Sequence, residues 1–302
     1  MTVDTLRDRP ILLLGSAGQI GSELATRLEA LGVVIRATRA DADFEQTAAL
    51  RALVRRVEPG LVVNAAAYTA VDDAEHDRER CERINAEAPG VLAEEAARAG
   101  APMVHFSTNY VFDGSAEVPY DEHAPTGPLS VYGWSKLRGE EAVAAAAPAH
   151  LIFRTAAVYG GTGRNFVRRI LELAREREEL RVVDDQLVAP TRASTIADVS
   201  VAAIGMWLGR TVEERGHGIY HLTSAGGTSW FGFAERILQL DPQRELHRVK
   251  RLRATTSAEL GAPAARPRNG LLDTAKLART FGITMPAWGD ELERSLTDLR
   301  HS

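Results

Sequence analysis

Short apolar runs alternate in the first half of the chain with longer stretches in which apolar residues recur every three or four positions. Short runs of this kind are typical of buried strands, and the longer pattern is typical of amphipathic helices. The predicted strands are 10–15, 33–38, 61–67, 101–107 and 150–155. The predicted helices between them are 19–31, 46–57, 78–100 and 131–147. This alternation predicts an α/β fold of the Rossmann type, a doubly wound parallel sheet with helices on both faces.

The alternation becomes irregular after Thr155. Loops rich in glycine and proline surround a charged helix predicted over 164–179, whose charges we interpret as a solvated face with paired side chains. This change predicts a smaller C-terminal substrate-binding domain. We expect a dinucleotide-binding domain at 1–159, with 192–226 returning to it, and a substrate-binding region at 160–191 and 227–302.

Composition restricts the possible partners. The 302 residues are 45% hydrophobic and carry a formal net charge of -5, with arginines interspersed among acidic residues, so we expect no nucleic-acid partner. The N-terminus has no apolar leader, and no apolar run is long enough to cross a membrane. A single cysteine, Cys81, excludes an internal disulfide and fits a reducing compartment. We therefore expect a cytoplasmic monomer or homodimer.

The first predicted strand ends in GSAGQIG, which places Gly15, Gly18 and Gly21 directly before a helix. A tight glycine turn lets the backbone approach a pyrophosphate, and the helix N-terminus presents free N–H groups to it. The alternative is a turn that is merely tight. In this first strand and helix unit, the pattern favours a dinucleotide site.

The end of the second predicted strand bears on the choice of cofactor. An acidic residue there would accept the ribose 2′-hydroxyl of NAD, whereas this chain has Thr38 and Arg39. A hydroxyl and a cation suit a 2′-phosphate, so NADPH is favoured and NADH remains possible. Arg39 could also be an ordinary surface arginine. Asp43 and Phe44 are expected to border the adenine.

A tyrosine and a lysine stand one helical turn apart at Tyr132 and Lys136. Of 36 basic residues only three are lysine, and this one opens a helix near the carboxyl ends of the strands. A positive charge beside a phenol would help it to give up its proton. Thr108 ends the preceding strand, where its hydroxyl could meet a substrate carbonyl. The alternatives are a packed surface pair and an ordinary turn residue.

These stretches together resemble the extended short-chain dehydrogenases, and more closely the dTDP-4-dehydrorhamnose reductase family. The likeness runs from Ile11 to about Leu299 through ordered motifs such as GSAGQIGSEL, HFSTNYVFDG, VYGWSKLRGE and ARPRNGLLDTAKL. It implies a reductase that uses NADPH or NADH on the C4 ketone of a nucleotide-bound sugar. It also implies that Tyr132 is the general acid, Lys136 its electrostatic partner and Thr108 a hydrogen-bond donor to the carbonyl.

The resemblance also assigns binding residues. The pyrophosphate turn would comprise Gly15, Gly18, Gln19 and Ile20, and Ala65, Ala66 and Tyr68 would lie alongside the cofactor. Substrate contacts would come from Thr108, Asn109, Arg266 and Asn269. Arginine is a suitable clamp for a diphosphate, although Arg266 could equally tether a loop.

The chain departs from the family pattern at several positions near the sugar. The family usually has Asp where this chain has Asn109, Ser then Trp at Ala156 and Ala157, and Ser at Gly270. Some members bind magnesium through glutamates, of which only Glu23 has a counterpart here, so we expect no metal. The changes are what a reductase adapted to another sugar would show.

Two functions from different classes remain open at this point. One is a reductase, acting on the family's own substrate or on another nucleotide-bound keto sugar of secondary metabolism. The other is a noncatalytic regulatory subunit that only binds the dinucleotide. The complete set of Thr108, Tyr132 and Lys136 favours the enzyme. Trp230 could line the substrate side or pack a core.

Overall fold

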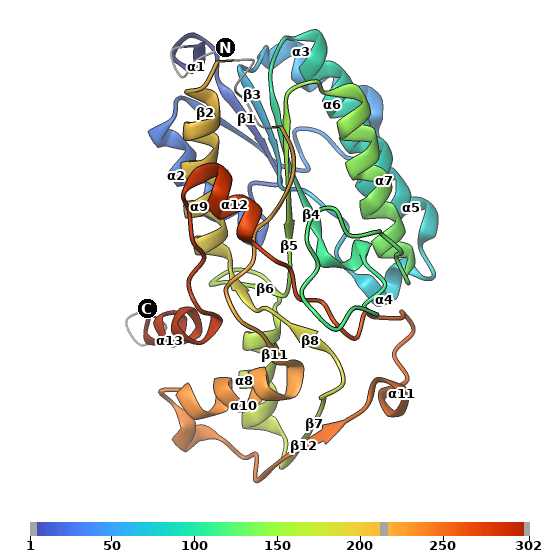
Figure 1. Cartoon of the computed structure of the whole chain (residues 1–302), viewed down its shortest axis with the longest axis vertical. Helices are drawn as coiled ribbons and strands as arrows, with labels where there is room; N and C mark the ends of the chain where they lie inside the picture. Colours follow the sequence, from blue (N-terminus) through green and yellow to red (C-terminus); the bar gives the residue numbers. More distant parts are fainter. Residues whose placement is uncertain (1–4, 212–216, 299–302) are drawn as a thin grey trace.

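A parallel sheet of six strands organises the computed structural model, which describes residues 5–211 and 217–298 (Figure 1). The strand order is β10-β5-β4-β3-β1-β2, and each of these pairs runs parallel. The strands are β1 (Ile11–Leu14), β2 (Val34–Ala37), β3 (Leu61–Asn64), β4 (Met103–Thr108), β5 (His150–Thr155) and β10 (Gly218–His221). This architecture confirms the predicted α/β class.

Helices cover both faces of the sheet (Figure 1). One face carries α2 (Gln19–Arg27), α9 (Ala193–Leu208) and α12 (Ala275–Phe281), and the other carries α3 (Thr47–Val57), α6 (Ala88–Arg98) and α7 (Val131–Ala146). Along β1, Ile11 and Leu13 belong to the core on the first face, and Leu12 and Leu14 to the core on the second. Alternate side chains of β1 thus enter different cores, which is why this strand in the middle of the sheet is apolar on both faces.

Strand β2 does not fit the prediction of a buried strand. Ile35 is 37% exposed, and Val33, just before the strand, is 68% exposed. The reason is position, since β2 lies at the end of the strand order and pairs with β1 alone in the described sheet. An edge strand keeps one side open to solvent.

The predicted helix over 78–100 is interrupted. It consists of α5 (Arg78–Glu82), a π-helical turn η2 (Arg83–Glu87) and α6. In the wider turn the Asn85 side chain points inward, where Nδ2 donates to the Tyr68 carbonyl and to Ser135 Oγ at 3.0 Å each. The interruption thus ties the loop after β3 to helix α7.

A second layer lies beneath the carboxyl ends of the strands (Figure 1). Its helices α8 (Phe166–Glu176), α10 (Trp230–Leu240) and α13 (Trp288–Asp298) share a core with strand β7 (Glu179–Val183), which pairs with β12 (Arg251–Thr255). Ile170, Leu171 and Ala174 of α8 are buried. The charged side of the helix is exposed and Arg169 pairs there with Glu172, as interpreted from the charges. The domain boundaries themselves stay a prediction.

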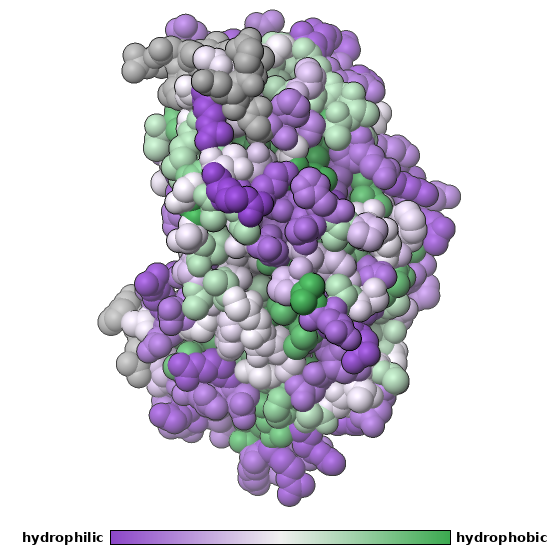
Figure 2. All heavy atoms as spheres, viewed as in Figure 1, coloured by the Kyte–Doolittle hydropathy of each residue, from purple (hydrophilic) through white to green (hydrophobic). Residues whose placement is uncertain are grey.

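Short elements complete the described chain. They are α1 (Thr5–Asp8), η1 (Leu28–Ala30), α4 (Val71–Ala74), η3 (Asn109–Val111), β6 (Val158–Tyr159), β8 (Leu187–Val188), β9 (Thr191–Arg192), β11 (Thr228–Ser229), η4 (Arg244–Leu246) and α11 (Ser257–Leu260). The face seen in Figure 2 is mostly hydrophilic, with apolar areas dispersed over it. Among the described residues, no helix has the length and apolar character that a membrane crossing requires.

A buried ion pair joins α7 to the sheet. Arg154 donates from Nε to Glu140 Oε1 at 2.9 Å and from Nη2 to Oε2 at 2.6 Å, and both side chains are at most 3% exposed. The guanidinium also lies 5.0 Å from the centroid of the Phe112 ring. Removing one partner of such a pair leaves an uncompensated charge in the interior.

We expect Glu140→Gln to lower the free energy of unfolding by about 3–5 kcal/mol, because Arg154 would remain charged and buried. Urea denaturation followed by circular dichroism measures this change. The matched control is Glu178→Gln, which breaks the exposed pair with Lys250 and should cost less than about 1 kcal/mol. Equal effects of the two substitutions would contradict the expectation.

Candidate active site

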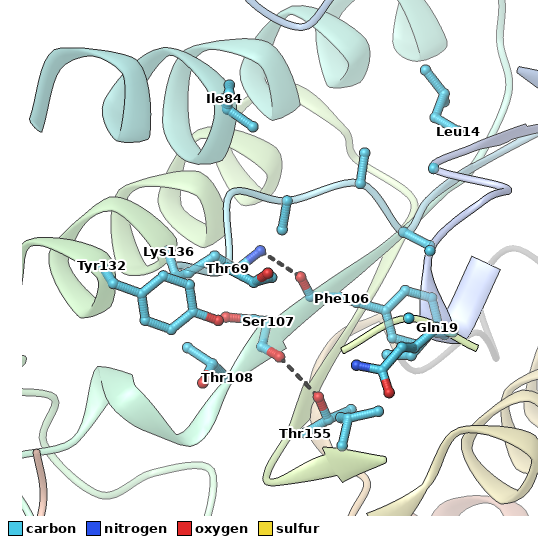
Figure 3. Close-up of a pocket in the computed structure, with 18 of the residues that line it drawn as sticks. Leu14, Gln19, Thr69, Ile84, Phe106, Ser107, Thr108, Tyr132, Lys136 and Thr155 are labelled. Atoms are coloured by element: carbon cyan, nitrogen blue, oxygen red, sulfur yellow. Dashed lines mark hydrogen bonds between the residues drawn. The ribbon is translucent and has the colours of Figure 1, made fainter. Parts of the chain in front are cut away.

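A cavity of about 890 Å³ opens at the carboxyl edge of the sheet. Its wall takes the last residues of four strands, Leu14, Ala37, Thr108 and Thr155, and Ala65, which directly follows β3. Figure 3 shows side chains from these separate segments converging on one space. Ligands of open α/β sheets bind at this edge, so the topology alone makes it the candidate site.

The glycine turn lies at one end of this cavity. Gly15 has a φ of +75°, and a Cβ there would lie 2.5 Å from the backbone nitrogen of Ala66. A Cβ on Gly21 would lie 2.0 Å from the Gly15 carbonyl oxygen. Both contacts are with backbone, which cannot move aside, so only glycine allows β1, α2 and the loop after β3 to approach this closely.

The first turn of α2 is available to a ligand. Its N-cap residue is Gly18, which has no side chain to satisfy the free N–H groups. Gln19 and Ile20 also line the cavity, and Gln19 Oε1 is buried with no partner among the described residues. Free N–H groups at a helix N-terminus bind anions, so this end of the cavity fits the pyrophosphate of a dinucleotide.

Thr108 and Tyr132 meet in the middle of the cavity. Thr108 ends β4 and Tyr132 lies in the first turn of α7, which Ser130 caps by accepting a hydrogen bond from the Gly133 N–H at 3.2 Å. The Thr108 side chain lies close enough to the phenol to oppose the rise of its pKa. Figure 3 shows the Tyr132 ring pointing toward Ser107 and Thr108. The sheet and the helix therefore place two hydroxyl groups where one carbonyl oxygen could bind both.

Lys136 is held one turn further along α7. It is 2% exposed, and its Nζ donates to the Phe106 carbonyl at 2.6 Å (Figure 3). Nζ also lies 3.4 Å from His105 Nε2, in a ring whose other nitrogen contacts the Asn64 amide. Burial lowers the pKa of Lys136 to about 8, and the charge of Glu140 opposes that shift. Lys136 is thus fixed by the sheet and loses its proton more easily than an exposed lysine.

The phenol of Tyr132 behaves differently from the sequence-based expectation. Burial raises its pKa, while the hydrogen bond with Thr108 acts in the opposite direction. Lys136 is not among the groups that shift it. The expectation of a phenol acidified by its neighbouring amine is therefore not met. A raised pKa instead keeps Tyr132 protonated at neutral pH, as a proton donor must be.

Thr38, Arg39, Asp43 and Phe44 line the far end of the cavity, beyond strand β2. Arg39 is 67% exposed and contacts Asp43 at 3.3 Å and Glu45 at 3.1 Å. Thr38 donates from N and Oγ1 to Asp41 at 2.7 and 2.9 Å. A 2′-phosphate bound here would have to replace these carboxylates as the partner of Arg39 and Thr38.

Two predicted binding residues lie outside the cavity lining. Tyr68 does not line it, although Ala65, Ala66, Ala67 and Thr69 around it do; its ring packs instead near Cys81 and Val131. Asn269 donates from Nδ2 to the carbonyls of Ala116 and Val118 and accepts from the Leu271 N–H. Asn269 is thus occupied in holding a loop, because the residue is 5% exposed and its amide nitrogen and oxygen both have partners.

A second cavity of about 930 Å³ adjoins the first. Tyr110 and Trp230 line both, so the two share a wall. Trp230 also packs against Phe166 with ring centroids 4.5 Å apart, so it lines the cavities and packs against a core as well. Arg266 lines the second cavity while donating to Asp72 at 2.7 Å.

Sequence reasoning missed several residues of these cavities. Arg169, Arg177 and Arg181 line the second one, and Tyr110, Arg164 and Asn165 line the first. Arg169 and Arg177 belong to the charged helix predicted over 164–179, and Arg181 follows it in β7. The pattern of charges in this part of the sequence did not predict a cavity, because the position of the cavity wall depends on how α8 and β7 pack. Among the described residues, no group of three or more His, Cys, Asp or Glu could hold a metal ion.

Comparison with known proteins identifies one family. The family model described as the RmlD substrate binding domain matches residues 9–301. A dTDP-4-dehydrorhamnose reductase of Burkholderia thailandensis is 44% identical over 92% of this chain and 95% of that protein. A probable dTDP-4,6-dihydroxy-2-methyloxan-3-one 4-ketoreductase of Streptomyces antibioticus is 39% identical, with 95% of each chain covered. The solved dTDP-4-dehydrorhamnose reductase of Bacillus anthracis in complex with NADP is 30% identical, with a TM-score of 0.86 over 96% of this chain and 99% of that one.

The glycine turn gives a direct test of the cofactor end of the cavity. We expect Gly15→Ala to weaken NADPH binding by at least about a hundredfold, because the new methyl must displace the backbone of Ala66 from the wall. Fluorescence titration with NADPH measures the change. Gly161→Ala is the matched control, since a Cβ there meets nothing within 4 Å. Unchanged binding by a folded Gly15→Ala variant would refute this placement of the cofactor.

Proposed function

The chain belongs to the RmlD substrate binding domain family, and on that premise we propose that it reduces the C4 ketone of a nucleotide-activated 4-keto-6-deoxy sugar with NADPH. The observation that carries this proposal is the convergence of Thr108, Tyr132 and Lys136 on the cavity that also contains the glycine turn. A dinucleotide-binding subunit would need only the glycine turn. The proton donor beside it is what reduction of a ketone requires.

The residues of the first cavity fit the reduced dinucleotide. The turn at Gly15 and the uncapped start of α2 would hold the pyrophosphate, and Ala65 and Ala66 would lie along its path. Arg39 would reach a 2′-phosphate after exchanging its carboxylate partners. When bound, the nicotinamide supplies the hydride that reduces the carbonyl carbon.

The carbonyl oxygen of the substrate would be bound and protonated by hydroxyl groups of the chain. Tyr132 would donate its proton to the oxygen as negative charge develops there, and Thr108 would hydrogen-bond the same oxygen. Burial keeps the phenol protonated until that moment, because water is excluded and the anion is disfavoured. Lys136 is anchored to the Phe106 carbonyl and would hold its charge close beneath the cofactor and the phenol.

The second cavity would take the nucleotide part of the substrate. Four arginines line it, Arg169, Arg177, Arg181 and Arg266, and they suit a diphosphate because a guanidinium can bind two oxygens at once. Phe166 and Trp230 offer aromatic faces for a base or a sugar. Tyr110 and Trp230 stand at the junction, so a sugar between the cavities would place its ketone near Tyr132.

The identity of the sugar is the open part of the proposal. Ala156 and Ala157 line the first cavity with small side chains, where the family usually has a serine and a tryptophan. The relative from Streptomyces antibioticus is named for the 4-ketoreduction of another dTDP-bound sugar. We expect the chain to work in the cytoplasm, since its single cysteine suits a reducing compartment. We also expect a monomer or homodimer.

A panel of dTDP-4-keto-6-deoxy sugars tests the proposal. We expect at least one sugar to drive NADPH oxidation, with product NMR showing a new hydroxyl at C4. Tyr132→Phe should lower kcat by about 10²–10⁴-fold while NADPH binding is kept, because only the transferable proton is lost. Tight NADPH binding without turnover of any sugar would favour the regulatory-subunit alternative.

The buried lysine predicts a particular pH dependence. We expect kcat/KM for NADPH to fall on the alkaline side with a midpoint near the Lys136 pKa of about 8, because the ammonium is lost while Tyr132 stays protonated. The arginine of Lys136→Arg keeps its charge to higher pH, so the alkaline fall in kcat/KM should shift to higher pH, however much activity the variant retains. An alkaline limb near the ordinary lysine pKa in the unsubstituted chain would count against this assignment.

A further inference from the structure

Three arginines from two separate segments meet one carboxylate beside the far end of the first cavity. Glu45 Oε1 accepts hydrogen bonds from Arg39 Nη2 at 3.1 Å and from Arg80 Nε at 3.0 Å. Its Oε2 lies 3.8 Å from Arg83 Nη2. Arg39 lies just after β2, whereas Arg80 belongs to α5 and Arg83 to η2. One negative charge therefore has three positive partners.

This cluster adjoins the part of the cavity that would take the 2′-phosphate of NADPH. Arg39 lines that end, and so does Ile84, which follows Arg83 in η2. Within the described chain, Glu45, Arg80 and Arg83 do not belong to the cavity lining. Arg39 is thus the member of the cluster that reaches the cavity, and the other two arginines are connected to it through Glu45.

Glu45 would keep cationic partners if Arg39 left it for a phosphate. The Arg80 guanidinium is held on its other side by the Tyr68 ring, with 6.0 Å to the ring centroid. The Glu45 N–H donates to Asp43 Oδ1 at 3.1 Å, and its side chain is 25% exposed. A partly buried carboxylate that loses its only cation is costly, whereas this one would remain paired with Arg80.

We propose that Glu45 and Arg80 set the preference between NADPH and NADH. Glu45 holds Arg39 before the cofactor binds, and Arg80 keeps Glu45 neutralised when Arg39 turns to the 2′-phosphate. Arg80 is therefore a positioning residue that acts through Glu45. The inference rests on the proposed function, which requires a reduced dinucleotide. A guanidinium can bind two phosphate oxygens at once, whereas the 2′-hydroxyl of NADH offers Arg39 no charge and leaves it with Glu45.

A double-mutant cycle on the affinities for the two dinucleotides tests this mechanism. We expect Glu45→Gln to tighten NADPH binding about two- to fivefold in fluorescence titrations, the range that an exposed ion pair corresponds to. Arg80→Gln should weaken it by a similar factor, because Glu45 then depends on Arg39. Neither substitution should change the Kd for NADH. In the double variant the loss caused by Arg80→Gln should disappear, because a neutral amide at position 45 needs no cation.

Glu82→Gln and Arg138→Gln are the matched controls. These two residues form their own ion pair at 2.7 Å between α5 and α7, so the substitutions change the net charge equally through a different pair. Both should leave the ratio of the two Kd values unchanged. A loss in Arg80→Gln that is equally large when Glu45 is already Gln would overturn the proposal, because Arg80 would then act on the phosphate directly. An unchanged ratio in Glu45→Gln would overturn it as well.

Failure of this inference can be told from failure of the proposed function. Binding of neither dinucleotide by the unsubstituted chain would overturn the function and this inference with it. Binding of both, with equal shifts for NADPH and NADH in the variants, would overturn the inference alone. Adenosine 2′,5′-bisphosphate carries the phosphate without the nicotinamide half, so its displacement of bound NADH should show the same shifts as NADPH. Adenosine 5′-monophosphate should show none, and equal shifts for these two competitors would also overturn the inference.

Discussion

The parallel pairing of β4 with β3 and β5 is the constraint on which the site depends. The register sets Asn64 beside His105 and Thr108 beside Thr155, so several strands end along one edge. Parallel strands present their carboxyl ends together, and the loops that follow them must form the wall of one cavity. The glycine turn after β1 and the start of α7 complete the same wall. A slip of one residue in β4 would turn Thr108 to the opposite face of the sheet.

Burial determines the proton chemistry of this cavity more than the attraction between neighbouring charges does. Tyr132 and Lys136 are both nearly inaccessible to solvent, and desolvation raises the pKa of the phenol and lowers that of the amine. Both shifts favour the neutral forms. The site therefore combines a phenol that retains its proton with an amine that can lose one near neutral pH. This arrangement suits a donor that must act only when an anion begins to form beside it.

The two adjoining cavities offer different chemical groups to the proposed substrate. The first contains the glycine turn and the hydroxyls, and the second carries arginines and aromatic side chains. Trp230 belongs to both walls and also packs against the core around Phe233. Small side chains at Ala156 and Ala157 enlarge the space beside the hydroxyls. Specificity for a sugar would thus come from the first cavity, and affinity for a nucleotide from the second.

The sequence by itself determined the layered α/β class, the position of the glycine turn, and the placement of Thr108 and Tyr132 at the ends of their elements. These features follow from local periodicity and from the backbone demands of glycine, which are written in contiguous residues. Tertiary structure alone decided that Tyr68 lies outside the cavity lining, that Asn269 is occupied in a loop, and that β2 is an exposed edge. It also brought Asn109 against Gly270, 161 positions apart in the chain. Such contacts depend on how segments far apart in the sequence pack together, and no local sequence pattern specifies that packing.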